Sequence, residues 1–98
     1  MESKEQAVRE QAAVRLGRLA DRAAVPALVR ALTDPAPAVR RAAARSLAST
    51  RDPAAGKGLM AALSDDDANV RAAAAFALGE IKSPTTGPAL LKALGDPQ

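Results

Sequence analysis

The 98-residue sequence contains no cysteine, no histidine, no tryptophan and no tyrosine. Without cysteine the chain can form neither a disulfide nor a thiolate nucleophile, and without histidine it lacks the commonest metal ligand and general base. The aspartate run 65–67 lacks the alternating ligands, the glycine and the distant glutamate of a calcium loop, and no serine has a histidine to activate it. We therefore predict that the protein is not an enzyme and holds no metal or cofactor.

A long hydrophobic run is also absent. Residues 1–6 (MESKEQ) include no apolar stretch of the kind found in signal peptides, and no uncharged segment approaches the length of a membrane span. We therefore expect a cytoplasmic protein with no membrane partner. The length predicts one domain, residues 1–98, and the abundance of alanine beside a single phenylalanine predicts helices packed closely around small side chains.

The formal net charge of +3 is unevenly distributed. Residues 1–49 contain nine lysines and arginines against five acidic residues, whereas residues 50–98 contain five against six. A basic half permits binding to an acidic protein surface or to nucleic acid. We favour the simpler interpretation that the arginines keep an alanine-rich surface soluble.

The sequence does contain a repeat. The segments VREQAAVRLG, VRRAAARSLA and VRAAAAFALG begin at Val8, Val39 and Val70, with 31 positions between successive starts. A fixed period of this size predicts a stack of helical repeats. Positions that match in all three copies fall at i, i+4 and i+8, on one stripe of a helix, and we predict this stripe as the repeated core. Its members are Val8, Ala12 and Leu16, then Val39, Ala43 and Leu47, then Val70, Ala74 and Leu78.

Six helices and no strand are expected. Three of them contain the Val-Arg pair near their start and are called VR helices below; we place them at 4–20, 37–49 and 68–82. Three short helices are expected at 22–32, 53–63 and 84–94. Asp21, Asp52 and Asp67 are predicted as N-terminal caps, and the glycines 17 and 79 are predicted to allow close approach of helices. Arginines 9, 40 and 71 recur with aspartates 34, 65 and 96 at the same period, which predicts a ladder of ion pairs.

The pattern VRxxAAxxLGxxxD from Val8, followed by AVPALVRALTDP from Ala24, resembles the HEAT-like repeat of the phycobilisome-lyase type and the artificial helical-repeat binders built from it. The resemblance extends from about Val8 to Pro97. It implies an all-α, right-handed α-α superhelix, a HEAT-like solenoid of about three 31-residue repeats, with the VR helices on the concave, ligand-binding side. That family includes bilin lyases, enzyme chaperones and plain binding modules.

A second stripe of the VR helices differs between the copies. Val14, Arg45 and Phe76 occupy equivalent places on it, and neighbouring helices pack about 8–10 Å apart, so one partner could touch all three. Arginine and aromatic residues are enriched at binding hot spots. We predict a partner-binding surface made of Gln11, Val14, Arg18, Arg41, Arg45, Ser49, Asn69, Phe76 and Glu80.

Three functions remain open from the sequence. The first is a non-catalytic protein-interaction or scaffold module that binds an unidentified protein on the concave face. The second, which follows from the resemblance, is a fragment or subunit of a bilin lyase-like or enzyme-maturation factor. The third is a weak nucleic-acid binder, ranked last because one aromatic side chain offers little base stacking. We also predict a homodimer formed through the ends of the solenoid, by way of Leu90, Leu91 and Leu94.

Overall fold

The computed structural model describes residues 4–19 and 21–81 of the chain. Within these ranges the protein is helical and contains no strand. The α-helices are α1 (Lys4–Leu19), α2 (Val25–Ala31), α3 (Pro37–Thr50), α4 (Gly56–Ala62) and α5 (Ala68–Ile81). Two 3₁₀ turns, η1 (Arg22–Ala24) and η2 (Pro53–Ala55), precede α2 and α4. The sixth helix expected at 84–94 and residue Asp96 lie outside the described residues.

The period found in the sequence is also present in the structure. The VR helices α3 and α5 begin at Pro37 and Ala68, and the short helices α2 and α4 begin at Val25 and Gly56, in both cases 31 positions apart. The repeat is therefore a structural unit of one short helix and one VR helix, and the all-helical fold class is confirmed.

The short helices begin differently from the expectation, because a 3₁₀ turn forms their first three residues. Asp21 and Asp52 accept hydrogen bonds from the backbone N–H two residues later, as predicted for capping residues. Their own carbonyls also close i→i+3 bonds to Ala24 and Ala55, which is the 3₁₀ pattern. Pro26 lies in the first turn of α2, where its missing N–H removes no helical bond.

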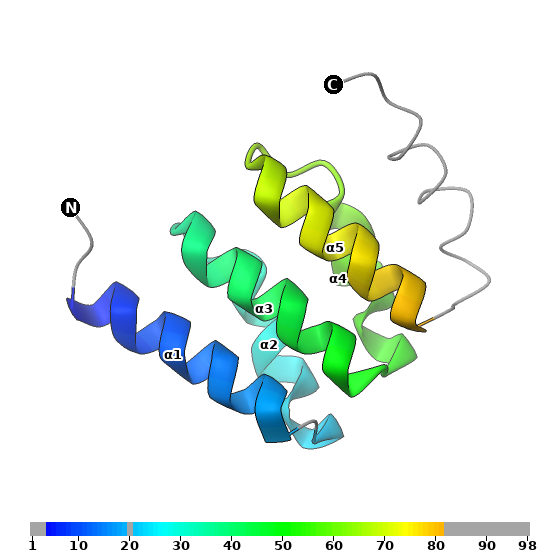
Figure 1. The fold of residues 1–98 in the computed structure, drawn as a ribbon, viewed down its shortest axis with the longest axis horizontal. Helices are drawn as coiled ribbons and strands as arrows, with labels where there is room; N and C mark the ends of the chain where they lie inside the picture. Colours follow the sequence, from blue (N-terminus) through cyan, green and yellow to red (C-terminus); the bar gives the residue numbers. More distant parts are fainter. Residues whose placement is uncertain (1–3, 20, 82–98) are drawn as a thin grey trace.

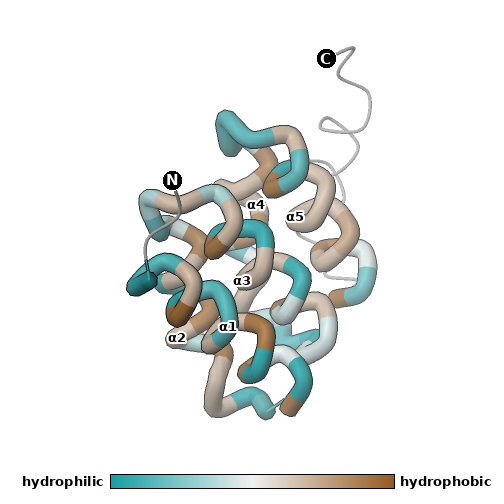
Figure 2. The backbone as a smooth tube through the Cα atoms, turned by 60° about the vertical axis from the view of Figure 1, so that its left-hand side comes forward, coloured by the Kyte–Doolittle hydropathy of each residue, from teal (hydrophilic) through white to brown (hydrophobic). Residues whose placement is uncertain are grey.

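The helices form two layers (Figure 1). The VR helices α1, α3 and α5 lie side by side in chain order, and α2 and α4 lie behind them. In the second layer α2 packs against α3 and α4 packs against α5, so each short helix covers the VR helix that follows it in the chain. Figure 2 shows that the loop before α5 is hydrophilic while α5 itself is largely hydrophobic.

The core lies between the two layers. Val39, Ala43 and Leu47 of α3 and the equivalent stripe of α5 are at most 1% exposed, and so are Leu28 of α2 and Leu59 of α4. Burying one such leucine contributes about 1.5–3 kcal/mol. The predicted core stripe is therefore correct for α3 and α5.

In α1 the same stripe was assigned wrongly. Val8 is 66% exposed and Ala12 is exposed, and only Leu16 packs against the core, half-buried. The reason lies in the pairing of layers, because α2 covers α3 rather than α1. The same residue pattern is thus buried in α3 and largely exposed in α1.

Helices α1 and α3 approach closely at Gly17. A Cβ atom placed on Gly17 would lie 2.2 Å from Oγ and 2.8 Å from Cα of Ser46. The Ser46 hydroxyl is buried and donates a hydrogen bond of 2.7 Å to the carbonyl of Ala13. Close approach is therefore confirmed at Gly17, whereas no atom of the described residues lies within 4 Å of a Cβ placed on Gly79.

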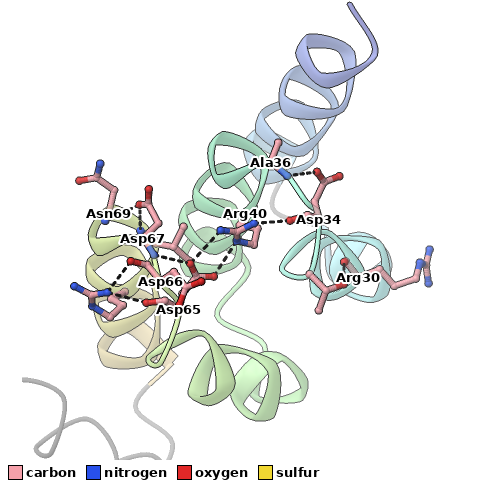
Figure 3. Close-up of polar contacts among 11 residues, drawn as sticks. Arg30, Asp34, Ala36, Arg40, Asp65, Asp66, Asp67 and Asn69 are labelled. Atoms are coloured by element: carbon pink, nitrogen blue, oxygen red, sulfur yellow. Dashed lines mark hydrogen bonds and ion pairs between the residues drawn. The ribbon is translucent and has the colours of Figure 1, made fainter. Parts of the chain in front are cut away.

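The predicted ladder runs along the N-terminal ends of the VR helices, and Figure 3 shows its contacts around Arg40 and the loop 65–67. Nε of Arg9 lies 2.7 Å from Oδ2 of Asp34, and Nε of Arg40 lies 2.9 Å from Oδ2 of Asp65. Arg40 also donates to the Asp34 carbonyl at 2.7 Å, and Arg71 donates to the Asp65 carbonyl at 2.7 Å. Each loop aspartate is therefore bonded by the VR helix before it and by the VR helix after it.

Both ladder carboxylates have a lowered pKa. At Asp34 the hydrogen bond from Arg9 is the largest cause of the lower pKa. At Asp65 partial burial acts to raise the pKa, but hydrogen bonds from the Asp67 N–H and from Arg40 outweigh it and the net shift is downward. The two aspartates are therefore ionised at neutral pH, and acid should weaken the ladder.

Candidate partner-binding surface

The surface of interest is the side of α1, α3 and α5 that the short helices leave uncovered, which we call the VR face. Val14, Arg45 and Phe76 occupy equivalent positions on it, one on each VR helix. Val14 is half-buried, Arg45 is exposed, and the Phe76 ring is 63% exposed. The core stripe of α3 and α5 holds this orientation, because burying Leu47 and Leu78 turns the opposite side of each helix outward.

A first hollow of about 320 Å³ lies between α1 and α3. Three arginines surround it, Arg18 from α1 and Arg41 and Arg45 from α3, together with the carboxylate of Glu10. Ser49 adds an exposed hydroxyl. The remaining lining residues are Val14, Gly17, Ala42 and Ser46. This hollow is suited to a negatively charged group.

A second hollow of about 560 Å³ lies between α3 and α5. Arg41 and Arg45 line it from α3, so these two arginines form the ridge that separates the two hollows. On the α5 side it is lined by Asn69, Ala72, Ala73 and Phe76. Because alanine and phenylalanine make up most of that side, the second hollow is suited to an apolar group.

A third hollow, of about 390 Å³, lies nearer the C-terminal ends of α3 and α5 and includes Arg45, Ser49 and Phe76. Its edge is crossed by an ion pair, in which Nη2 of Arg51 lies 3.0 Å from Oε1 of Glu80. Arg51 ends α3 in the left-handed conformation, with φ of 51°. Glu80 is therefore already paired, unlike the arginines around the first hollow.

Three arginines of the described residues form ion pairs, and among those that form none, which also include Arg15, Arg22 and Arg30, three lie on the VR face. Arg9, Arg40 and Arg51 pair with carboxylates. No carboxylate in the described part of the chain forms an ion pair with Arg18, Arg41 or Arg45, and all three line the VR face. Arg40 and Arg41 are neighbours in the sequence, yet about 100° of helical rotation directs one into the ladder and the other toward the hollows.

Of the nine residues predicted for this surface, the structure places eight around the three hollows. Gln11 is exposed but lines none of them. Its equivalents in the next copies are Ala42 and Ala73, which lie on the side of each helix that faces the preceding VR helix. Because no VR helix precedes α1 in the described residues, Gln11 lies on the outer edge of α1. The predicted end-association residues Leu90, Leu91 and Leu94 lie outside the described residues.

Several residues that line the hollows were not predicted from the sequence. Glu10 and Ala72 are each 31 positions from Arg41, so the repeat period could have identified them once Arg41 was chosen. The others missed are Gly17, Ala42, Ser46, Ala48, Arg51 and Ala73. These are mostly small residues, and only the packed structure shows that they form the floor between helices.

Within residues 4–19 and 21–81, no three acidic side chains are grouped so that they could hold a metal ion. Over the same ranges, no helix is both long enough and apolar enough to cross a membrane. The side chains that line the VR face include arginines, the exposed hydroxyl of Ser49 and the exposed ring of Phe76.

Among known protein families, a family model described as HEAT repeats aligns with residues 1–68 and again with residues 56–98. Together the two alignments span the chain, and their overlap reflects the internal repeat. No curated protein matches the sequence.

Proposed function

Because the chain belongs to the HEAT-repeat family, we propose that it is a non-catalytic protein-interaction module that binds a partner protein on the VR face. HEAT repeats commonly act as interaction scaffolds. We also propose the more specific features that the resemblance implies. These are a right-handed superhelix of about three repeats, a concave VR face, and a relationship to the phycobilisome-lyase type and to artificial binders. A cytoplasmic location is part of the same proposal.

The observation that carries the proposal is that arginines without an ion pair lie together on the VR face beside an exposed aromatic ring. Arg40, which is structural, is bonded to two loops, whereas Arg41 and Arg45 on the same helix have no ion-pair partner among the described residues. They lie beside Phe76, an aromatic ring left 63% exposed. Arginine and aromatic side chains at the centre of a surface are typical of binding hot spots.

Nucleic-acid binding is the last-ranked alternative, and the arginines 18, 41 and 45 on the VR face are the feature that favours it. Neutralising a few phosphates gives weak, salt-dependent affinity, and a single ring provides little stacking. A bilin lyase-like or enzyme-maturation role rests on the resemblance alone, and we rank it below protein binding.

A displayed library of random 12-residue peptides, selected on the immobilised full-length protein, tests the proposal. We expect the enriched peptides to lose binding to the variants Arg45→Ala and Phe76→Ala and to keep it with Arg30→Ala. Arg30 is a matched control because it is an exposed arginine of the short-helix layer, and its side chain points away from the ladder (Figure 3). Peptides that bind all three variants equally would place the binding site elsewhere and contradict the proposal.

A further inference from the structure

Resting on the proposed function, we propose that the VR face recognises an extended segment of a partner protein that carries a carboxylate and, about three residues away, a large apolar side chain. Two features of the structure lead to this chemistry. One is the group of unpaired arginines around the first hollow, and the other is the apolar wall of the second.

The first hollow selects the carboxylate. Arg41 and Arg45 are four residues apart on α3, so their side chains lie on one side of the helix and repel each other. Arg18 faces them from α1, and against these three cations the lining contains one carboxylate, Glu10. A carboxylate bound among the arginines would relieve the repulsion and accept charge-assisted hydrogen bonds. The excess of positive charge therefore favours an acidic residue.

The second hollow selects the apolar group. Ala72 is exposed, Ala73 lies at the floor, and the Phe76 ring stands 63% exposed at the wall. Its volume of about 560 Å³ accommodates a large side chain. An aliphatic or aromatic group placed there would cover the ring and displace water from apolar surface, which is the main source of affinity at hot spots.

The distance between the two hollows sets the number of residues between the carboxylate and the apolar side chain of the partner segment. They lie on either side of α3 and share Arg41 and Arg45, so their centres are about one helix spacing apart, roughly 8–10 Å. A polyproline-II segment rises about 3.1 Å per residue and returns to the same side every third residue. A carboxylate at one position and an apolar side chain three positions away would therefore enter neighbouring hollows.

The peptide selection tests this chemistry directly. We expect enriched peptides to contain an aspartate or glutamate three positions from a large apolar residue. One such peptide is then made with Glu→Gln (or Asp→Asn) and, separately, with its apolar residue replaced by serine. Because a hydrogen bond to a charged group contributes about 1.5–3 kcal/mol, removing the carboxylate should weaken binding at least about tenfold.

The same peptides measured on variants show which hollow each group occupies. With Arg45→Gln the loss caused by removing the carboxylate should disappear, while the loss caused by the serine replacement should remain. With Phe76→Ala the pattern should reverse. Circular dichroism melts of both variants confirm folding, which we expect to be unchanged because Arg45 and Phe76 are exposed.

Three other results would overturn the inference, and they differ in whether the proposed function also fails. Neutral peptides that still depend on Arg45 and Phe76 would leave the proposed function standing and remove the acidic specificity. Peptides insensitive to both variants would remove the inference and the proposed function together. A second copy of the protein could also occupy the VR face. Excess unlabelled protein would then displace the bound peptide, and the protein would form a dimer that Phe76→Ala dissociates.

Discussion

Replacing Gly17 by alanine should destabilise the protein through the contact between α1 and α3. The added Cβ atom would meet Oγ of Ser46 at 2.2 Å, Cβ at 2.4 Å and Cα at 2.8 Å. The last of these is a backbone atom, so a rotation of the serine side chain cannot remove the clash. The two helices must therefore separate, and this separation would weaken or break the hydrogen bond from the Ser46 hydroxyl to the Ala13 carbonyl.

The magnitude follows from three opposing contributions. Alanine is favoured over glycine in a helix interior by about 1 kcal/mol. Overpacking costs about 1–3 kcal/mol, and a buried hydroxyl left without a partner costs about 1–3 kcal/mol. Their balance is a loss of about 1–5 kcal/mol. For a domain of this size each kcal/mol corresponds to about 4–8 °C in the melting temperature.

Thermal unfolding followed by circular dichroism measures the effect, and Gly79→Ala is the matched control. Gly79 is the equivalent residue of the third VR helix, and no atom of the described residues would lie within 4 Å of its new Cβ. This control should gain up to about 1 kcal/mol from helix propensity. Adding Ser46→Gly to Gly17→Ala should recover part of the loss. If Gly17→Ala melted at or above the wild-type temperature, the close contact between α1 and α3 would be refuted.

Four further results are expected. Leu47→Ala should cost about 2–5 kcal/mol in denaturant unfolding because Leu47 is fully buried, while exposed Arg45→Ala should change stability by no more than about 0.5 kcal/mol; equal losses would mean that the faces are misassigned. The lowered pKa of Asp34 gives a stabilisation that is complete above the unfolded carboxyl pKa of about 3.9 and is lost as the pH falls through the folded-state pKa. Asp34→Asn should therefore reduce the acid dependence of the unfolding free energy, and an unchanged pH profile would contradict the ladder's role. Binding to a DNA duplex, measured by fluorescence anisotropy, should be weak and should disappear at physiological salt; submicromolar binding there would reverse the ranking of functions. Sedimentation at tens of micromolar should show a dimer that Leu91→Glu dissociates, and a monomer unaffected by this change would exclude association through the ends.

Much of the fold could be predicted from the sequence because its determinants are local or strictly periodic. The apolar stripe of α3 depends on helical geometry alone, and the caps Asp21 and Asp52 act on N–H groups two residues away. The ladder was found because arginine and aspartate recur with the same 31-residue period, and the structure joins Arg9 with Asp34. The candidate surface was partly identified for the same reason, since equivalent positions on adjacent helices must face the same side.

Burial and pairing, in contrast, were decided by the tertiary structure, because they depend on which neighbour covers a residue. Val8 and Val39 begin the same motif, yet Val8 is 66% exposed and Val39 is 1% exposed, since α2 packs mainly on α3 and touches α1 much less. Gly17 and Gly79 occupy equivalent places, yet in the described structure only Gly17 lies against a neighbouring helix. A repeat period establishes which positions are equivalent, whereas the free energy of each position depends on the atoms packed against it.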